Sequence, residues 1–145
     1  MNMEDKVDLL FEFIGFKIKE EYARIAITCS NYAEENHTIS QDALAIVGDH
    51  VIKLMITSSE FIKDNTVSKK YLTDKYQEIE SNCSLQKIGV NNNIKSFLFH
   101  LNTDLNGNKK LATSIEAIIG AIYLSEGIEK TKSFMTKIDL LSVDK

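Results

Sequence analysis

The chain has 145 residues, of which 43% are hydrophobic and 26% charged, and its formal net charge is −4 at pH 7. A chain of this length buries about 70% of the surface that its unfolded form exposes, so one compact domain can form without metal ions or disulfides. It has no run of 18 apolar residues, and it begins with an acidic segment where a presequence would be basic. We therefore expect an intracellular, cytoplasmic protein with no membrane span.

The basic residues are unusual, because 16 of the 17 are lysines and Arg24 is the only arginine. The guanidinium fork suits phosphate recognition, so an acidic chain with one arginine is a poor candidate for strong nucleic-acid binding on its own. A codon bias towards lysine would explain the same composition. Cys29 and Cys83 belong to no metal-binding motif and are expected to be reduced, buried thiols.

Helical periodicity dominates the first half of the chain, which has no proline to interrupt it. Apolar spacing predicts a helix over residues 4–14, ended by Gly15, and a second over residues 19–29. Residues 30–38 are polar and lack periodicity, so we expect a connection there. Ser40 is a candidate N-cap for a third helix over residues 41–63, expected to be the longest and the most buried.

The second half continues the helical pattern. It predicts a helix over residues 68–83, a turn-rich loop over 89–93, a short helix or strand over 94–99 and a polar loop over 102–108. A nearly all-apolar helix over 109–125 must lie in the core, and a last helix follows over 128–140. No internal repeat or shift in composition divides the chain. We therefore expect one all-α domain of six or seven helices over residues 1–145.

Two acidic positions interrupt the apolar helices. Asp49 follows Gly48 inside an apolar run, with Asp42 seven residues earlier, and Glu116 stands among apolar residues of the later helix. A carboxylate in such a place is costly unless it is paired or binds a cation. Gly48 and Gly120 would each let another helix approach closely, so we expect the two acidic positions to face each other. The alternative is that Glu116 pairs with a lysine or bonds a backbone group.

Three segments together resemble the ribonuclease III family. Residues 22–36 are similar to the family stretch A-L-T-H-x-S-Y-x-x-E-N, residues 42–51 to the signature E-R-L-E-F-L-G-D-A-V, and residues 111–124 to the signature L-A-D-x-F-E-A-L-I-G-A-I-Y-L. The resemblance implies an all-α endonuclease domain that usually forms a homodimer and cuts double-stranded RNA. It also implies Mg²⁺ held by carboxylates of the two signature helices.

The resemblance assigns the metal ligands residue by residue. Asp49 and Glu116 are kept as the catalytic metal ligands, and Asp42 matches the first acidic residue of the first signature. Three positions where the family has acidic residues carry others: Ala45, Thr113 and, close to a further family glutamate, Lys69. Two carboxylates can hold one Mg²⁺ weakly, but two ions need more negative charge than remains. We therefore expect weak or absent Mg²⁺ binding and little or no cleavage.

The resemblance also concerns partners. Ile46 replaces a signature phenylalanine that packs across the family's dimer interface, and is the interface candidate. We expect no double-stranded-RNA-binding domain, and hence weak RNA affinity. Lysines near the starts of two predicted helices could line an RNA groove, although such a run is often only a solvated face: Lys63, Lys69, Lys70, Lys75, Lys109 and Lys110.

Three functional hypotheses follow. The lost acidic residues favour an RNA-processing or RNA-assembly protein with an inactive or impaired nuclease site, a pseudoenzyme acting as a binding module. It would form a homodimer, or a heterodimer with another ribonuclease III-like subunit. The alternative is an active, Mg²⁺-dependent endoribonuclease that cleaves double-stranded or structured RNA, such as a ribosomal RNA precursor. A structural dimer with no role in RNA metabolism is the third.

Overall fold

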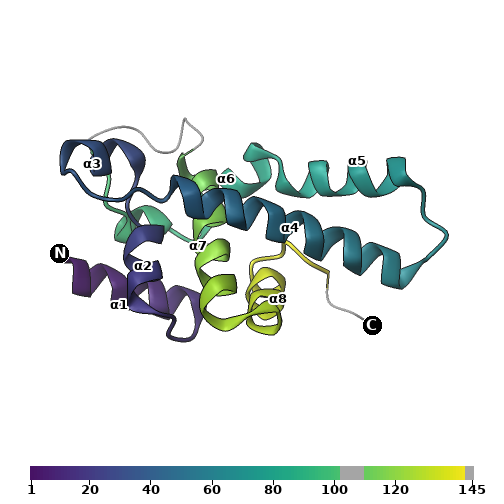
Figure 1. Cartoon of the computed structure of the whole chain (residues 1–145), viewed down its shortest axis with the longest axis horizontal. Helices are drawn as coiled ribbons and strands as arrows, with labels where there is room; N and C mark the ends of the chain where they lie inside the picture. The colour runs from purple at the N-terminus through teal and green to yellow at the C-terminus, as the bar shows by residue number, and fades with distance from the viewer. Residues whose placement is uncertain (102–109, 143–145) are drawn as a thin grey trace.

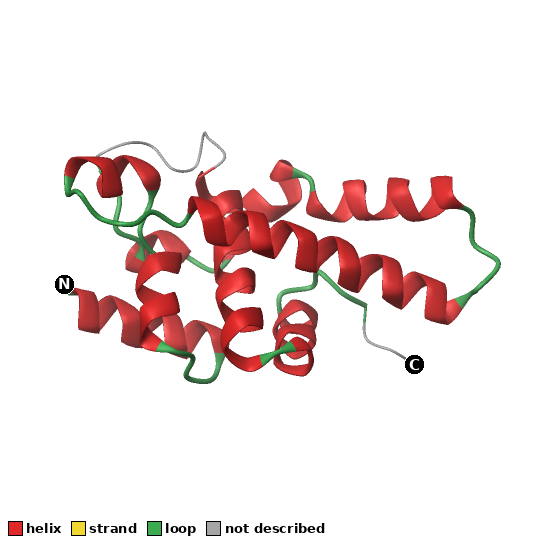
Figure 2. Ribbon diagram, viewed as in Figure 1, coloured by secondary structure: helices red, strands yellow, loops and turns green. Residues whose placement is uncertain are grey.

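The computed structural model describes residues 1–101 and 110–142. Within these ranges the chain is almost wholly helical and has no strand, apart from one isolated bridge between Thr28 and Phe99 (Figure 2). The all-α prediction is therefore confirmed. The predicted loop over 102–108 and Lys109 lie outside the described residues. The helices, which can be followed in Figure 1, are α1 (Met3–Ile14), α2 (Glu20–Ala26), α3 (Ser30–Glu35), α4 (Asp42–Lys63), α5 (Lys69–Glu80), α6 (Asn82–Asn91), the 3-10 helix η1 (Ile94–Phe97), α7 (Lys110–Glu126) and α8 (Ile128–Lys137).

Local capping explains why the first helix has the expected bounds. The Asn2 side chain accepts a hydrogen bond from the Asp5 backbone N–H at 2.9 Å and begins α1. Gly15 ends it with φ of 91°, a conformation that favours glycine. The start of α4 differs slightly from the prediction, because Gln41 rather than Ser40 occupies the N-cap position; the Ser40 hydroxyl still accepts from the Asp42 N–H at 3.3 Å.

Backbone hydrogen bonds to Phe99 determine the conformation of the chain between α2 and α4. The Phe99 N–H donates to the Ile27 carbonyl at 2.7 Å, and the Cys29 N–H donates to the Phe99 carbonyl at 2.9 Å. These bonds pair Thr28 with Phe99 and leave Cys29 extended, so α2 ends at Ala26, earlier than predicted. The prediction of a connection over 30–38 was wrong for its first part, which forms α3. Distant backbone partners decide these bounds, and no local pattern encodes them.

The helix predicted over residues 68–83 is divided in two. Ser81 has an extended backbone (φ −53°, ψ 145°) and separates α5 from α6, with its hydroxyl accepting from the Ser84 N–H at 3.3 Å. The turn-rich loop predicted over 89–93 was largely wrong, because α6 continues to Asn91. The break turns α6 so that it buries Leu85 against the core.

The two cysteines differ in environment. Cys29 is buried, and burial raises the pKa of its thiol to about 11, so the prediction of a buried thiol is confirmed. Cys83 is exposed, which contradicts the prediction. The reason is the break at Ser81, which starts a new helix with a different buried face.

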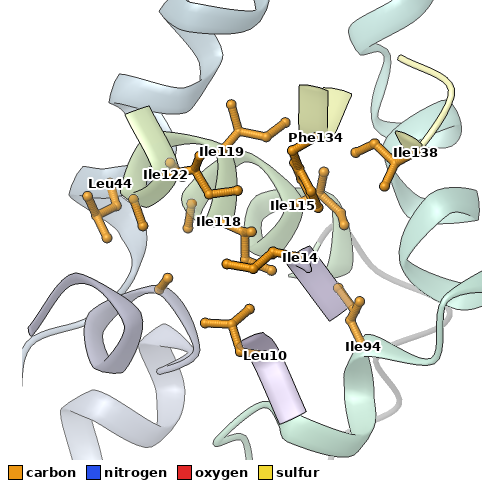
Figure 3. Packing of buried hydrophobic residues seen from close by; sticks show 14 of the residues in the cluster. Leu10, Ile14, Leu44, Ile94, Ile115, Ile118, Ile119, Ile122, Phe134 and Ile138 are labelled. Carbon is orange, nitrogen blue, oxygen red and sulfur yellow. The ribbon is translucent and has the colours of Figure 1, made fainter. Parts of the chain in front are cut away.

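The core is built around α7. Ile115, Ile118, Ile119 and Ile122 of this helix are all fully buried, and Figure 3 shows them between side chains of α1, α4 and α8. Ten of the 17 residues of α7 are buried, against seven of the 22 in α4. The prediction that residues 41–63 form the longest helix is confirmed, but the prediction that it is the most buried was wrong.

The exposure of α4 has a simple geometric cause. Its C-terminal half extends beyond the other helices together with α5, which returns alongside it (Figure 1). Leu54, Phe61 and Ile62 are therefore 52–83% exposed in spite of their helical spacing. Within the described ranges, no helix is both long and apolar enough to cross a membrane.

Two glycines allow α4 and α7 to cross in backbone contact. A Cβ at Gly48 would overlap the carbonyl oxygen of Glu116, and a Cβ at Gly120 would overlap the carbonyl oxygen of Leu44. No larger side chain fits at either position without separating the helices. The expectation of a close approach at Gly48 and Gly120 is confirmed.

We expect Gly48→Ala to destabilise the fold by about 3 kcal/mol, because the added methyl group must push two packed backbones apart. The free energy of unfolding, measured with urea, tests this. Ser58→Ala is a matched control on an exposed face of the same helix and should change stability by less than about 0.5 kcal/mol. Equal stability of the Gly48→Ala variant and the wild type would contradict the close crossing.

Candidate metal centre

Three carboxylates from three helices meet at one place. Asp49 in α4, Glu80 at the end of α5 and Glu116 in α7 each offer an oxygen, and these oxygens lie within 4.8 Å of one another. All three side chains are partly buried. Among the described residues they form a group that has the size and the chemistry of a divalent-cation site.

The packing of the helices explains the meeting. The glycine crossing presses the second turn of α4 against the second turn of α7, so Asp49 comes to lie beside Glu116. The helix α5 runs back along α4, and its last residue, Glu80, returns to the level of Asp49 (Figure 1). The site is therefore supported by rigid elements and not by loops.

One lysine lies at the edge of the group. The Nζ atom of Lys53 is 3.1 Å from Oδ2 of Asp49 and 3.7 Å from Oε1 of Glu80. It also lies 5.6 Å from the centre of the Tyr76 ring. The side chain of Lys53 is 38% exposed, whereas that of Glu80 is only 12% exposed.

The crowding of like charges changes the acidity of each group. Burial, followed by the nearby Asp49, raises the pKa of Glu80 to about 8 and that of Glu116 to about 7. A hydrogen bond with Glu80, and further bonds with Lys53, lower the pKa of Asp49. Without a cation, the group therefore retains protons near neutral pH, because three adjacent carboxylates cannot all ionise freely.

The donor set fits a hard divalent ion. Among the described residues, the buried oxygen Oε2 of Glu80 has no hydrogen-bond partner. An unsatisfied buried oxygen is costly, and a cation would satisfy it. Mg²⁺ prefers oxygen ligands and is commonly held by a few carboxylates.

The structure brings together two of the three predicted ligands. Asp49 and Glu116 face each other, whereas Asp42 is exposed in the first turn of α4 and is not part of the group. Ala45 is buried one turn before Asp49, and Thr113 lies one turn before Glu116. Neither supplies a charge.

The candidate RNA-binding lysines are distributed over two places. Lys69 and Lys70 begin α5, at the end of that helix opposite to Glu80, and Lys70 pairs with Asp74 at 2.6 Å. Lys110 begins α7. Lys75 lies farther along α5, beside Glu60 and Lys63 at the margin of a shallow pocket. The structure therefore does not gather these lysines into one patch.

Glu80 was not predicted as a ligand. Its signal was present, because Glu80 follows Tyr76 by four residues and so lies beside the apolar stripe of its helix. A glutamate next to an apolar stripe is also common on solvated helices, so this signal alone does not identify a ligand. Glu80 is identified as a ligand only by the direction in which α5 returns along α4, because this direction brings it to Asp49.

Comparisons with known proteins agree with this architecture. Residues 19–141 match the sequence model of a family described as Ribonuclease-III-like. Ribonuclease 3 of Clostridium tetani is 30% identical over 142 residues, covering 94% of this chain and 58% of that protein. Ribonuclease 3 of Clostridium acetobutylicum is 29% identical over 141 residues, covering 93% and 59% respectively.

Solved structures give the same result for the fold. The nuclease domain of ribonuclease III from Campylobacter jejuni matches with a TM-score of 0.78 and 23% identity, over 91% of this chain and 94% of that one. The helices therefore form a ribonuclease III nuclease-domain fold. With the family match over residues 19–141, the chain belongs to the ribonuclease-III-like family. It spans 58–59% of the length of the two curated relatives.

The raised pKa values predict a stability that falls with rising pH in the absence of metal. Glu80 and Glu116 bind protons more tightly in the folded chain than at their ordinary pKa of 4.5, so their contribution is present at low pH and is lost as the pH rises through 7 to 8. Between about pH 5 and about pH 8.5, with a chelator present, we expect a loss of several kcal/mol in the free energy of unfolding, measured with urea.

Glu80→Gln should remove much of this pH dependence, because the amide stays neutral at every pH. Glu78→Gln is the matched control, since Glu78 lies on the same helix and is exposed. A Glu80→Gln profile that parallels the wild type would show that Glu80 does not share protons with Asp49.

Proposed function

We propose that this chain is a metal-dependent nuclease domain of ribonuclease III type that acts on double-stranded or structured RNA through a single divalent ion. The observation that carries the proposal is the third carboxylate. The expectation of little or no cleavage rested on two ligands, Asp49 and Glu116, and Glu80 raises the number to three. Three carboxylates are enough for one Mg²⁺ and too few for two closely spaced ions, which repel each other.

The roles of the residues follow from their positions. Asp49, Glu80 and Glu116 would hold the ion. When bound, Mg²⁺ lowers the pKa of a water ligand and offsets negative charge on the phosphate that is attacked. The helices α4 and α7 fix Asp49 and Glu116 through backbone contact, so these two carboxylates are oriented before RNA arrives.

The lysines supply charge for the RNA backbone. Lys110 precedes Glu116 by six residues on α7, a distance of about 9 Å along the helix, whereas Lys69 and Lys70 lie about 15–16 Å from Glu80 along α5. They would contact phosphates on either side of the metal centre as separate point charges. Such contacts give weak binding that depends strongly on salt.

Ile46 is the candidate contact for a dimer. Ile46 is 63% exposed on α4, one turn before the exposed residue His50. An exposed isoleucine on a rigid helix suits a contact with a second subunit. We propose that this subunit is a second copy of the chain; a related ribonuclease III-like subunit would use the same surface.

A second candidate function is RNA binding without cleavage. The observation that favours it is the pair of uncharged residues Ala45 and Thr113, one turn before Asp49 and one turn before Glu116. If the chemistry requires negative charge at these two positions, Glu80 does not replace it. The domain would then act as a dimeric binding module in RNA processing or assembly.

We expect the chain to cleave labelled duplex RNA slowly with Mg²⁺ or Mn²⁺. Asp49→Asn and Glu80→Gln should each lower the rate by about 100-fold or more, because each removes a charged metal ligand. Glu78→Gln, on the same helix as Glu80 but exposed, should retain the wild-type rate.

Two other results would contradict cleavage by this chain. Cleavage that survives Asp49→Asn would indicate a contaminating nuclease. Duplex RNA binding without any cleavage, with an affinity that falls steeply with salt, would support the binding module instead. In that case Ala45→Glu combined with Thr113→Asp should increase Mg²⁺ affinity, measured by calorimetry.

We expect Ile46→Asp to convert the dimer to a monomer, because a carboxylate cannot be buried in an apolar contact without a partner. Sedimentation at several concentrations measures the oligomeric state. Val90→Asp replaces an exposed apolar residue on another helix, α6, and should leave the dimer unchanged. A wild-type chain that is monomeric at high micromolar concentration would rule out the homodimer.

A further inference from the structure

Lys53 contacts two of the three carboxylates that would hold a metal ion. It lies one turn after Asp49 on α4, and its ammonium group contacts carboxylate oxygens from two helices, at 3.1 Å in Asp49 and 3.7 Å in Glu80. The Tyr76 ring, 5.6 Å away, flanks it on the α5 side. A positive charge is therefore built into the margin of the acidic group.

The uncharged residues and the lysine lie on opposite sides of the ligands along their helices. Ala45 and Thr113, which supply no charge, lie one turn before the ligands of their helices, whereas Lys53 lies one turn after Asp49. Ala45 and Thr113 offer no carboxylate to a second ion. The ammonium group of Lys53 supplies, on the other side of Asp49, the positive charge that a second ion would bring. Three carboxylates and one ammonium leave a formal charge of −2 when ionised, which one divalent ion neutralises.

We propose that Lys53 is a resident cation of the metal centre, which takes the place of a second metal ion and weakens the binding of the first. The proposal rests on the proposed function, because it assumes that Asp49, Glu80 and Glu116 hold a divalent ion. It adds that the lysine, and not only the carboxylates, determines the affinity for the ion.

An ordinary surface ion pair is the competing explanation. Pairs between residues four apart on one helix are common and contribute little. Lys53 differs because it also contacts Glu80 on another helix, and Glu80 is only 12% exposed. A pair of the ordinary kind would not affect metal binding, so a binding measurement separates the two explanations.

The experiment measures Mn²⁺ binding by calorimetry, with the number of ions confirmed by electron paramagnetic resonance. We expect one ion per chain for the wild type. Lys53→Met keeps the length of the side chain and removes its charge, so it should bind the ion about tenfold more tightly. Lys63→Met is the matched control, since Lys63 lies on the same helix and pairs with Glu60, away from the acidic group.

Each outcome has a defined meaning. A wild type that binds one ion, with the same affinity and number in Lys53→Met, overturns the role of Lys53 and leaves the proposed function standing. Two ions in the wild type also overturn it. If neither protein binds an ion, both proposals fall. If only Lys53→Met binds one, the lysine is a resident cation and the proposed metal-dependent function of the wild type fails.

Thermal unfolding of each variant shows whether it is folded. If Lys53→Met does not fold, Lys53→Gln is used, which also removes the charge and retains a polar end. Tighter Mn²⁺ binding by Lys53→Gln than by the wild type then supports the proposal, and equal binding overturns it.

Discussion

Backbone contact between α4 and α7 is the constraint on which the rest of the molecule depends. Gly48 and Gly120 allow each helix to touch a carbonyl oxygen of the other, and no other residue type fits at either place. This contact buries α7 at the centre of the fold and places Asp49 beside Glu116. The same two glycines therefore serve both packing and the site. A metal centre positioned by backbone contact has little freedom to adjust, which suits a site that must hold its ligands ready for an ion.

The close crossing has an electrostatic cost that the surrounding residues offset. Three carboxylates within 4.8 Å repel one another, and burial raises the pKa of both Glu80 and Glu116. Lys53 offsets part of this repulsion from the edge. One buried oxygen of Glu80 still lacks a partner among the described residues. Groups with raised pKa values and unsatisfied oxygens are typical of sites that gain their stability from a ligand.

The sequence predicted what local periodicity and glycine positions encode. The bounds of α7 and α4 agree with the prediction within about one residue, and the facing of Asp49 and Glu116 followed from Gly48 and Gly120. Long-range contacts account for the failures. The pairing of Phe99 with residues 27–29 shortened α2, and the break at Ser81 both exposed Cys83 and ended α5 at Glu80. Glu80 was missed because its role depends on how α5 returns along α4, a tertiary feature that helical periodicity does not describe.

Charge changes in one direction along α4. The uncharged Ala45 lies before Asp49 and the charged Lys53 lies after it, next to Glu80 of α5. The negative charge of the site is therefore extended towards α5, a helix in which no residue, all being within the described range, is fully buried. Tyr76 and Ile79 of α5 pack against the core. Polar contacts also hold this helix, among them the 2.7 Å bond from the Tyr71 hydroxyl to Glu60 and the pair of Lys53 with Glu80. An ion bound by Glu80, Asp49 and Glu116 would connect α5 to the two helices at the centre of the fold, and so would also stabilise this less buried helix.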